Sequence, residues 1–295
     1  MQKVAIIGFG KLGQALANVL EARKGNIQIS AWDVVATNDP RQVPTLAEST
    51  QNASTLFFSV PSKHFKQCLS QLGQLDQSVF LVSLTKGIDP DSEKLPFELM
   101  TLAYPQNPIG VISGPMLSEE LEKRLPTKAA LASHQKEQVK EIIDLFKGTS
   151  LSLEESDDLV GVSLLGILKN VYCLALGLSD GLNLGSNFKS CLVLLSFREM
   201  AAIVEENGGR AETITTFAGL PDFITTGYSQ KSRNYTYGFK KARGEDLGGI
   251  MAEGADNIEN VIGKAANLSQ YPLLKVIKEV FIQNQDPKVI VRLIA

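Results

Sequence analysis

The sequence predicts an α/β domain followed by an all-helical domain, and three observations lead to this prediction. Up to about residue 155, short apolar runs rich in β-branched residues alternate with stretches of helical periodicity, which is typical of a mainly parallel sheet. From Asp157 onward the chain has several helical segments and no convincing strand. The first of these segments, Leu159 to Ser179, is almost wholly apolar. We therefore expect two domains of ordinary size, 1–155 and 156–295.

A glycine turn follows the first expected strand, residues 3–7. It consists of Gly8, Phe9, Gly10, Lys11, Leu12 and Gly13. A helical stretch, a second strand over 27–32 and Asp33 come next, and this order is the dinucleotide-binding fingerprint of a Rossmann-type doubly wound sheet. The glycines permit a tight turn and close approach of a pyrophosphate, which the helix amino terminus favours. Asp33 can accept both ribose hydroxyls and would repel a 2′-phosphate, which favours NAD as cofactor and leaves NADP possible.

Further strands are expected at 55–60, 78–87 and 109–115, and the runs 127–133 and 149–155 extend the sheet at its far edge. Ligands of open α/β sheets bind outside the carboxyl ends of the strands. Residues at these ends are therefore candidates for the cofactor cleft, among them Pro61, Lys86 and the Gly114-Pro115 turn. For Lys86 a solvated loop residue is the competing interpretation.

Composition narrows the possible partners. The net charge is −3, the calculated pI is about 5.6, and no block of lysine or arginine occurs, so we expect no nucleic-acid partner. Three widely spaced cysteines indicate a reducing compartment, and two histidines do not support a metal site. Because an expected strand begins within the first few residues, we expect no targeting peptide. We therefore expect a cytoplasmic protein without a metal.

The apolar segment from Leu159 to Ser179 contains one charged residue, Lys169, followed by Asn170. A helix of this length spans about 30 Å, close to a bilayer core. A membrane span fits poorly, because the lysine is central and basic flanks are absent. Two interpretations remain open: a core helix whose lysine snorkels to the surface, or a buried lysine paired for proton transfer.

A polar stretch interrupts the helical half, in which we expect helices over 188–207, 211–218, 246–265 and 271–283. Asp222 lies in an expected turn, and Ser232, Arg233 and Asn234 follow it. The planar fork of Arg233 suits a phosphate or carboxylate, to which Asn234 could add an amide donor. A solvated basic loop and a helix-capping role for Asp222 are the alternatives.

Taken together, these motifs resemble the NAD(P)-dependent glycerol-3-phosphate dehydrogenases over nearly the whole chain. The pair Lys169-Asn170 in a long apolar helix, followed about sixty residues later by Ser232-Arg233-Asn234, is the most specific part. The other motifs are the glycine turn, Val60-Pro61-Ser62, Thr85-Lys86-Gly87-Ile88, Ser113-Gly114-Pro115, Asp180-Gly181-Leu182, Gly185-Ser186-Asn187, Gly219-Leu220-Pro221-Asp222, Gly238 and Ala252-Glu253-Gly254.

The resemblance implies a role for each matching residue. Lys169 would be the acid/base that protonates the ketone oxygen of dihydroxyacetone phosphate, with Asp222 as its partner and Lys86 as a second catalytic residue. The implied substrate contacts are Asn170, Gly114, Thr226, Ser232, Arg233 and Asn234. Glu253 and Arg233 would join the glycine turn, Asp33, Pro61 and Lys86 around the cofactor.

The resemblance also implies a homodimer that interconverts sn-glycerol 3-phosphate and dihydroxyacetone phosphate and feeds glycerophospholipid synthesis. The chain departs from the family pattern at Lys11-Leu12, Met116 and Pro221. These departures leave two alternatives: an oxidoreductase for another small phosphorylated or acidic 2-hydroxy compound, or a catalytically weak NAD-binding paralogue.

Overall fold

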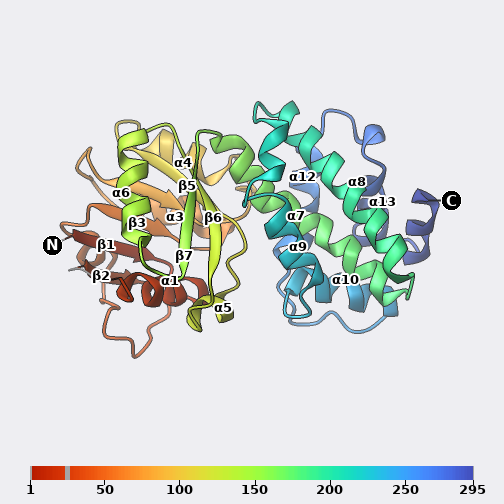
Figure 1. Cartoon of the computed structure of the whole chain (residues 1–295), viewed down its shortest axis with the longest axis horizontal. Helices are drawn as coiled ribbons and strands as arrows, with labels where there is room; N and C mark the ends of the chain where they lie inside the picture. Colours follow the sequence, from red (N-terminus) through yellow and green to blue (C-terminus); the bar gives the residue numbers. More distant parts are fainter. Residues whose placement is uncertain (1, 24–26, 295) are drawn as a thin grey trace. The chain divides into compact units, whose positions relative to one another are not determined.

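A seven-stranded sheet organises the first part of the chain (Figure 1). The computed structural model describes residues 2–23 and 27–294. The strands are β1 (Gln2–Ile7), β2 (Ile27–Trp32), β3 (Thr55–Phe58), β4 (Phe80–Ser83), β5 (Ile109–Ser113), β6 (Thr127–Ser133) and β7 (Leu151–Ser156). They lie side by side in the order β2-β1-β3-β4-β5-β6-β7.

The directions of the strands determine which carboxyl ends lie at the same edge of the sheet. Strands β1 to β5 run parallel, β6 runs antiparallel to β5, and β7 runs parallel to β6. Strand β2 lies on one side of β1 and β3 on the other, so the strand order reverses there, and nucleotides bind at such switch points outside the carboxyl ends. The turn after β1 and Asp33 after β2 both lie at this edge. The predicted doubly wound sheet is confirmed.

Helices cover both faces of the sheet. They are α1 (Lys11–Glu21), α2 (Leu46–Thr50), α3 (Ser62–Gln71), α4 (Pro96–Ala103), α5 (Ser118–Glu122) and α6 (Lys136–Phe146). Val4 and Ile6 of β1 pack in a core shared with α1, α5 and α6, whereas Ala5 and Ile7 pack in a second core with α2, α3 and α4. Successive side chains of a strand point to opposite faces. The continuous apolar run of β1 therefore follows from burial on both sides.

The chain divides into two compact units between Ser163 and Leu164, called here the sheet unit and the helical unit. Among the described residues, the helical unit contains no β-strand. Its elements are α7 (Leu159–Gly181, which begins in the sheet unit), α8 (Gly185–Glu206), η1 (Ala211–Thr215), α9 (Leu220–Tyr228), α10 (Arg233–Arg243), α11 (Glu253–Asp256), α12 (Ile258–Lys264), η2 (Leu268–Gln270), α13 (Pro272–Phe281) and η3 (Pro287–Leu293), the η segments being 3-10 helices.

Helix α7 is a core helix, although it is long and apolar enough to cross a membrane. The most apolar window of the helix is 94% buried inside the protein, which explains why apolar residues occupy every face. Helix α10 approaches the bare backbone of α7 closely. A Cβ at Gly177 would collide with the carbonyl oxygen of Tyr235, and a Cβ at Gly238 with that of Leu174. Small residues at these two positions therefore set the distance between the helices.

A buried carboxylate connects three helices of this unit. Glu199 of α8 accepts hydrogen bonds from the backbone N–H groups of Leu273 (2.7 Å) and Leu274 (2.9 Å), in the first turn of α13. The hydroxyl of Tyr172, on α7, donates to the same carboxylate at 2.9 Å. Glu199 therefore satisfies backbone donors at the start of α13 that the helix itself leaves unpaired.

Two helices expected from the sequence are wrong in extent. Only Ala211–Thr215 of the segment 211–218 is helical, as a 3-10 turn, and the hydroxyls of Thr215 and Thr216 bond to carbonyls three residues earlier, which competes with α-helix formation. Most of the first half of 246–265 is irregular. There Asp246 accepts the N–H of Gly248 in a turn, and Gly249 has φ +76°, a conformation that interrupts a helix.

Two other helices, α9 and α10, replace the turn and loop that the sequence predicted. Pro221 lies in the first turn of α9, where its missing N–H and fixed φ suit a helix start. Ser232 caps α10 by accepting a hydrogen bond from the N–H of Tyr235 at 3.3 Å. Asp222 is therefore a helical residue, and Arg233 is the first residue of α10.

Candidate functional site

The glycine turn leaves space where a phosphate would need it. Gly8 has φ +89°, and a Cβ on it would lie 2.7 Å from the Ser59 carbonyl carbon. A Cβ at Gly13 would collide with the Gly8 carbonyl oxygen, whereas a Cβ at Gly10 would meet no atom within 4 Å. Gly10 precedes the first residue of α1, and no side chain caps this helix end. The free N–H groups and the open space fit an anion such as a pyrophosphate.

Asp33 is oriented by two backbone donors. Its Oδ2 accepts the N–H of Phe9 at 2.6 Å, and its Oδ1 accepts the N–H of Val35 at 2.9 Å. Phe9 itself is buried. The carboxylate is therefore held beside the glycine turn, at the carboxyl end of β2, as a ribose acceptor requires.

A cavity of about 250 Å³ adjoins Asp33. Gly8, Val60 and Pro61 contribute to its wall, as do residues that sequence reasoning missed: Trp32, Val34, His64, Gln67, Cys68 and Gln71. The last four recur at i, i+3, i+4 and i+7 along α3, which places them on one helix face. This helical spacing is the sequence signal that could have identified them as one face.

Lys11 and Leu12 contribute differently from the glycines around them. Lys11 is exposed at the first residue of α1, whereas Leu12 packs against the core of the sheet unit. Met116, another departure from the family pattern, also belongs to this core. The structure therefore accounts for Leu12 and Met116 by packing.

Hydrogen bonds join the turns after β3, β4 and β5. The Thr85 hydroxyl donates to the Val60 carbonyl at 2.8 Å, and the Lys86 ammonium donates to the Gly114 carbonyl at 3.3 Å. Lys86 is half-buried, so it is not a freely solvated loop lysine. The structure brings Lys86 and Gly114 together at the same edge of the sheet as the glycine turn.

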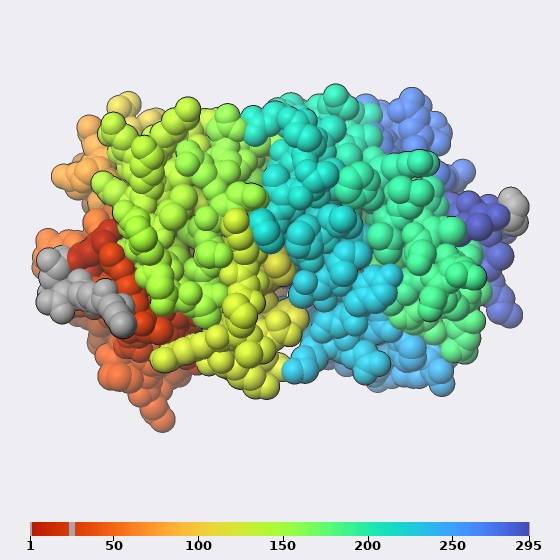
Figure 2. All heavy atoms as spheres, viewed as in Figure 1, coloured from red at the N-terminus to blue at the C-terminus, as the bar shows by residue number. Residues whose placement is uncertain are grey.

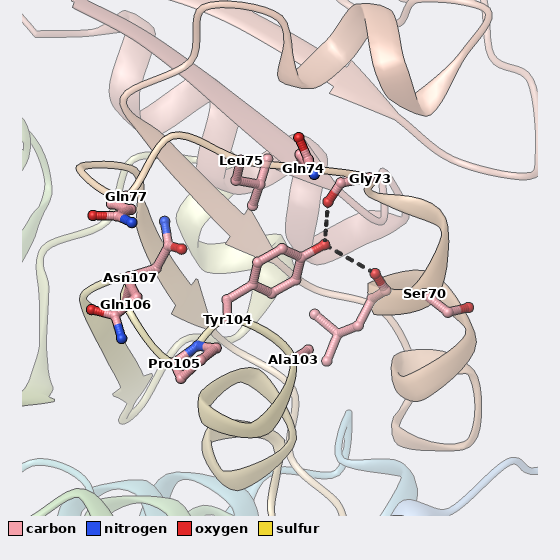
Figure 3. Close-up of a pocket in the computed structure, with 11 residues that line it drawn as sticks. Ser70, Gly73, Gln74, Leu75, Gln77, Ala103, Tyr104, Pro105, Gln106 and Asn107 are labelled. Atoms are coloured by element: carbon pink, nitrogen blue, oxygen red, sulfur yellow. Dashed lines mark hydrogen bonds between the residues drawn. The ribbon is translucent and has the colours of Figure 1, made fainter.

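A larger depression of about 650 Å³ lies elsewhere on the sheet unit (Figure 3). The end of α3 and the segments 73–77 and 103–107 line it, and the Tyr104 hydroxyl donates to the Gly73 carbonyl at 2.9 Å. These segments precede β4 and β5. The depression is therefore at the opposite strand ends from Asp33, away from the edge where nucleotides bind.

In the helical unit, the side chain of Lys169 is buried and makes two hydrogen bonds. Its side chain is 8% exposed, and its Nζ donates to Asp222 Oδ1 at 2.8 Å and to Thr226 Oγ1 at 2.7 Å. Asp222 and Thr226 are four residues apart on α9 and therefore face the same way. The lysine does not snorkel to the surface: its charge is held inside the protein by a carboxylate and a hydroxyl.

Asn234 connects three segments beside this pair. Its Nδ2 donates to Asn170 Oδ1 at 2.9 Å, and its Oδ1 accepts the N–H of Gly254 at 2.8 Å. Glu253 precedes that glycine and is half-exposed. The side-chain amide predicted to contact phosphate is therefore largely engaged within the protein.

Arg233 differs from its neighbours in being exposed. Over the residues that the structure describes, no ion pair or hydrogen bond holds its guanidinium. It stands at the amino terminus of an eleven-residue helix, next to the capping Ser232. An exposed arginine at a helix amino terminus is suited to bind an anion.

Within 2–23 and 27–294, no group of three His, Cys, Asp or Glu side chains could hold a metal ion. The predicted site residues form two sets, one at the carboxyl edge of the sheet and one around Lys169 in the helical unit.

Comparison with known proteins identifies the family. The profile described as NAD-dependent glycerol-3-phosphate dehydrogenase N-terminus matches residues 33–139, and the C-terminus profile matches residues 158–292. The chain belongs to this dehydrogenase family. A glycerol-3-phosphate dehydrogenase (NAD(P)+) of Acaryochloris marina is 33% identical over 279 residues, which cover 92% of this chain and 87% of the relative. The family resemblance expected from the motifs is confirmed.

Solved structures agree with this dehydrogenase fold. The crystal structure of glycerol-3-phosphate dehydrogenase from Coxiella burnetii matches with a TM-score of 0.88 and 28% identity, covering 99% of this chain and 98% of that one. Glycerol-3-phosphate dehydrogenase from Saccharomyces cerevisiae matches with a TM-score of 0.85 at 22% identity, covering 98% of both chains. The second likeness shows the shared fold alone.

Proposed function

We propose that this chain catalyses the NAD(P)-dependent interconversion of sn-glycerol 3-phosphate and dihydroxyacetone phosphate. The observation that carries the proposal is the buried ammonium of Lys169, which lies within a mainly apolar helix and is bound to Asp222 and Thr226. A buried charge is expensive to maintain, and proton transfer is a chemical reason for keeping one. The names of the relatives and the glycine turn support the choice of reaction.

Lys169 handles the proton at the substrate oxygen. Two of its three N–H bonds point to Asp222 and Thr226, and the third has no acceptor among the described residues. That third bond can donate to the ketone oxygen at carbon 2 and transfer a proton as the alcohol forms. In the reverse direction the neutral amine takes the proton back. Asp222 stabilises the ammonium form, and Thr226 fixes its direction.

Arg233 and the start of α10 hold the substrate phosphate in this proposal. The guanidinium offers a fork of donors, and the helix end adds backbone N–H groups beside Ser232. Asn234 fixes Asn170 and the start of α11 with one hydrogen bond from each polar atom of its side-chain amide. Lys86, held near Gly114, is assigned to the substrate oxygens. Glu253 is assigned to the nicotinamide end of the cofactor.

The glycine turn and Asp33 hold the nucleotide, with the cavity beside Pro61 as a further part of its site. When bound, the nicotinamide cofactor supplies or accepts the hydride. Asp33 favours NAD, because its carboxylate can accept from ribose hydroxyls and repels a 2′-phosphate. We further infer a cytoplasmic homodimer that feeds glycerophospholipid synthesis; light scattering on the purified protein tests the dimer.

The decisive experiment is turnover of dihydroxyacetone phosphate with NADH and NADPH. Lys169→Ala should abolish turnover while NADH binding, measured by fluorescence, stays close to that of the native protein. Lys241→Ala is the matched control, because Lys241 is half-buried and its ammonium donates to Asn284 Oδ1 at 2.8 Å, away from Lys169. Near-normal turnover by Lys169→Ala would remove the lysine from the mechanism. Activity confined to another ketone, or cofactor binding without turnover in the native protein, would refute the proposed substrate or reaction.

A further inference from the structure

A second buried lysine lies in the helical unit. Lys189, near the start of α8, has a side chain that is 8% exposed, and its Nζ lies 2.6 Å from Asp180 Oδ2 at the end of α7. The mechanism proposed above gives this ion pair no part in the reaction. Burying a charge is unfavourable, and apolar residues of similar size often stabilise a protein as well or better. Stability alone therefore does not explain why this ion pair is present.

Two tyrosine rings surround the same ammonium. The Lys189 Nζ lies 4.0 Å from the ring centroid of Tyr228 and 5.1 Å from that of Tyr235. The Tyr235 hydroxyl also donates to Asp180 Oδ2, at 2.7 Å. Cations are attracted to the faces of aromatic rings within about 6 Å, most strongly where water is excluded. Lys189, Asp180, Tyr228 and Tyr235 are called the lysine cluster below.

The two tyrosines of the lysine cluster lie at the two ends of one short segment of the chain. Tyr228 is the last residue of α9, and Tyr235 is in the first turn of α10. The segment 229–234 between them contains Ser232 and Arg233. Both ends of this segment are therefore attached to one ammonium. Helices α9 and α10 form part of the visible surface of the helical unit, in cyan and light blue (Figure 2).

An ammonium can restrain this segment in a way that an apolar side chain cannot. Apolar packing is not directional, whereas the ion pair fixes the Lys189 Nζ against Asp180, and each ring must then present its face to that nitrogen. The hydrogen bond from Tyr235 to Asp180 fixes the second ring further. The start of α10, which carries Arg233, is thereby held before any ligand arrives. Such preorganisation improves binding because less freedom is lost when the ligand binds.

We propose that Lys189 is a positioning residue that fixes the segment 229–234, so that Arg233 is already placed to bind the substrate phosphate. This inference rests on the proposed function, in which Arg233 binds that phosphate. Lys189 does not contact the substrate. Its effect should therefore appear in substrate affinity and in discrimination for the phosphate, rather than in the chemical step.

The kinetic test compares Lys189→Met with Lys241→Met. Methionine keeps an unbranched side chain and removes the charge, and Lys241 is a half-buried lysine on α10 outside the cluster. Lys189→Met should raise KM for dihydroxyacetone phosphate by about tenfold and change kcat by less than about threefold, since binding is lost equally in ground and transition states. Its preference for dihydroxyacetone phosphate over unphosphorylated dihydroxyacetone should fall by about the same factor. Lys241→Met should match the native enzyme in each respect.

A second variant covers the case in which Lys189→Met fails to fold. Tyr228 is 51% exposed, so Tyr228→Leu leaves the ion pair of Lys189 and Asp180 intact and removes one ring. It should raise the same KM in the same direction by a smaller factor. An unchanged KM in Tyr228→Leu and in a folded Lys189→Met would overturn the proposal.

Hydrogen exchange provides a readout that does not depend on turnover. In the ligand-free protein, backbone amides of 229–234 should exchange faster in Lys189→Met than in the native protein, while those of β1 and β3 stay unchanged. Equal exchange in both proteins would overturn the positioning role. If the native protein fails to turn over dihydroxyacetone phosphate and exchange still accelerates in the variant, the proposed function fails and the restraint of 229–234 by Lys189 stands.

Discussion

Replacing Gly177 with alanine should destabilise the helical unit, because α10 lies against the bare backbone of α7 at this residue. The new Cβ would collide with the Tyr235 carbonyl oxygen and lie 2.8 Å from the Phe239 nitrogen, where ordinary contact begins at 3.4 Å. Both neighbours are main-chain atoms, so no side chain can rotate away. Relief requires a shift of α10 relative to α7.

The size of the effect follows from what that shift disturbs. Overpacking a well-packed interior costs about 1–3 kcal/mol. Moving α10 also strains the buried hydrogen bond of 2.9 Å between Asn234 and Asn170, and a buried polar group left without its partner costs about 1–3 kcal/mol. We expect a total near 3 kcal/mol, which lowers the melting temperature by roughly 10 °C in a domain of this size.

Thermal unfolding followed by circular dichroism measures this change, and Gly263→Ala is its control. Gly263 lies within α12, and a Cβ there would meet no atom within 4 Å. Alanine at this position should stabilise the helix by about 0.5–1 kcal/mol, because glycine is a poor helix former. The two substitutions should thus shift the melting temperature in opposite directions. A Gly177→Ala protein that melts at or above the native temperature would refute the close approach of α7 and α10.

Two further predictions concern buried titratable groups. Cys191 is exposed, whereas Cys68 and Cys173 are buried. Burial raises the pKa of the Cys68 thiol to about 12 and also raises that of the Cys173 thiol. A thiol reagent at about pH 8 should therefore modify only Cys191 rapidly, and rapid labelling of a Cys191→Ser variant would contradict this. Burial also raises the pKa of the Glu199 carboxyl above its ordinary value. Between the pKa of Glu199 in the unfolded chain and its higher pKa in the folded protein, the folded state binds more protons. The native protein should therefore lose stability relative to Glu199→Gln, measured as the difference between their unfolding free energies, as pH rises from about 4 to about 7. Urea titrations measure the difference, and a constant or rising value would show that Glu199 is not destabilised by burial.

The features that could be predicted from the sequence are those that depend on residues close together along the chain. The glycine turn and Asp33 follow each other in a short stretch, and each position has its own steric or chemical requirement, so the sheet and the nucleotide edge could be predicted together. Helices α9 and α10 were missed because Pro221 and Ser232, which begin them, were interpreted as turn and loop residues. Proline and serine occur in both settings.

Long-range contacts were beyond local rules. The cavity beside Asp33 draws on α3, whose periodic polar face was visible in the sequence but could equally have faced water. Lys189 gave no signal, because the two tyrosine rings that its ammonium meets belong to α9 and α10, far from Lys189 along the chain. Neither spacing nor composition brings such residues together.

The carboxylate that begins α13 has a consequence for the order in which the chain can fold during synthesis. Glu199 and its backbone donors at Leu273 and Leu274 are more than seventy residues apart. A ribosome adds about 5–20 residues per second, so several seconds separate the emergence of the acceptor from that of its donors. During this interval Glu199 has the Tyr172 hydroxyl but lacks the two backbone donors that satisfy it in the native structure, which opposes its burial. We therefore expect α7 and α8 to stay loosely packed on the ribosome until α13 has emerged, whereas the sheet unit can complete its core earlier.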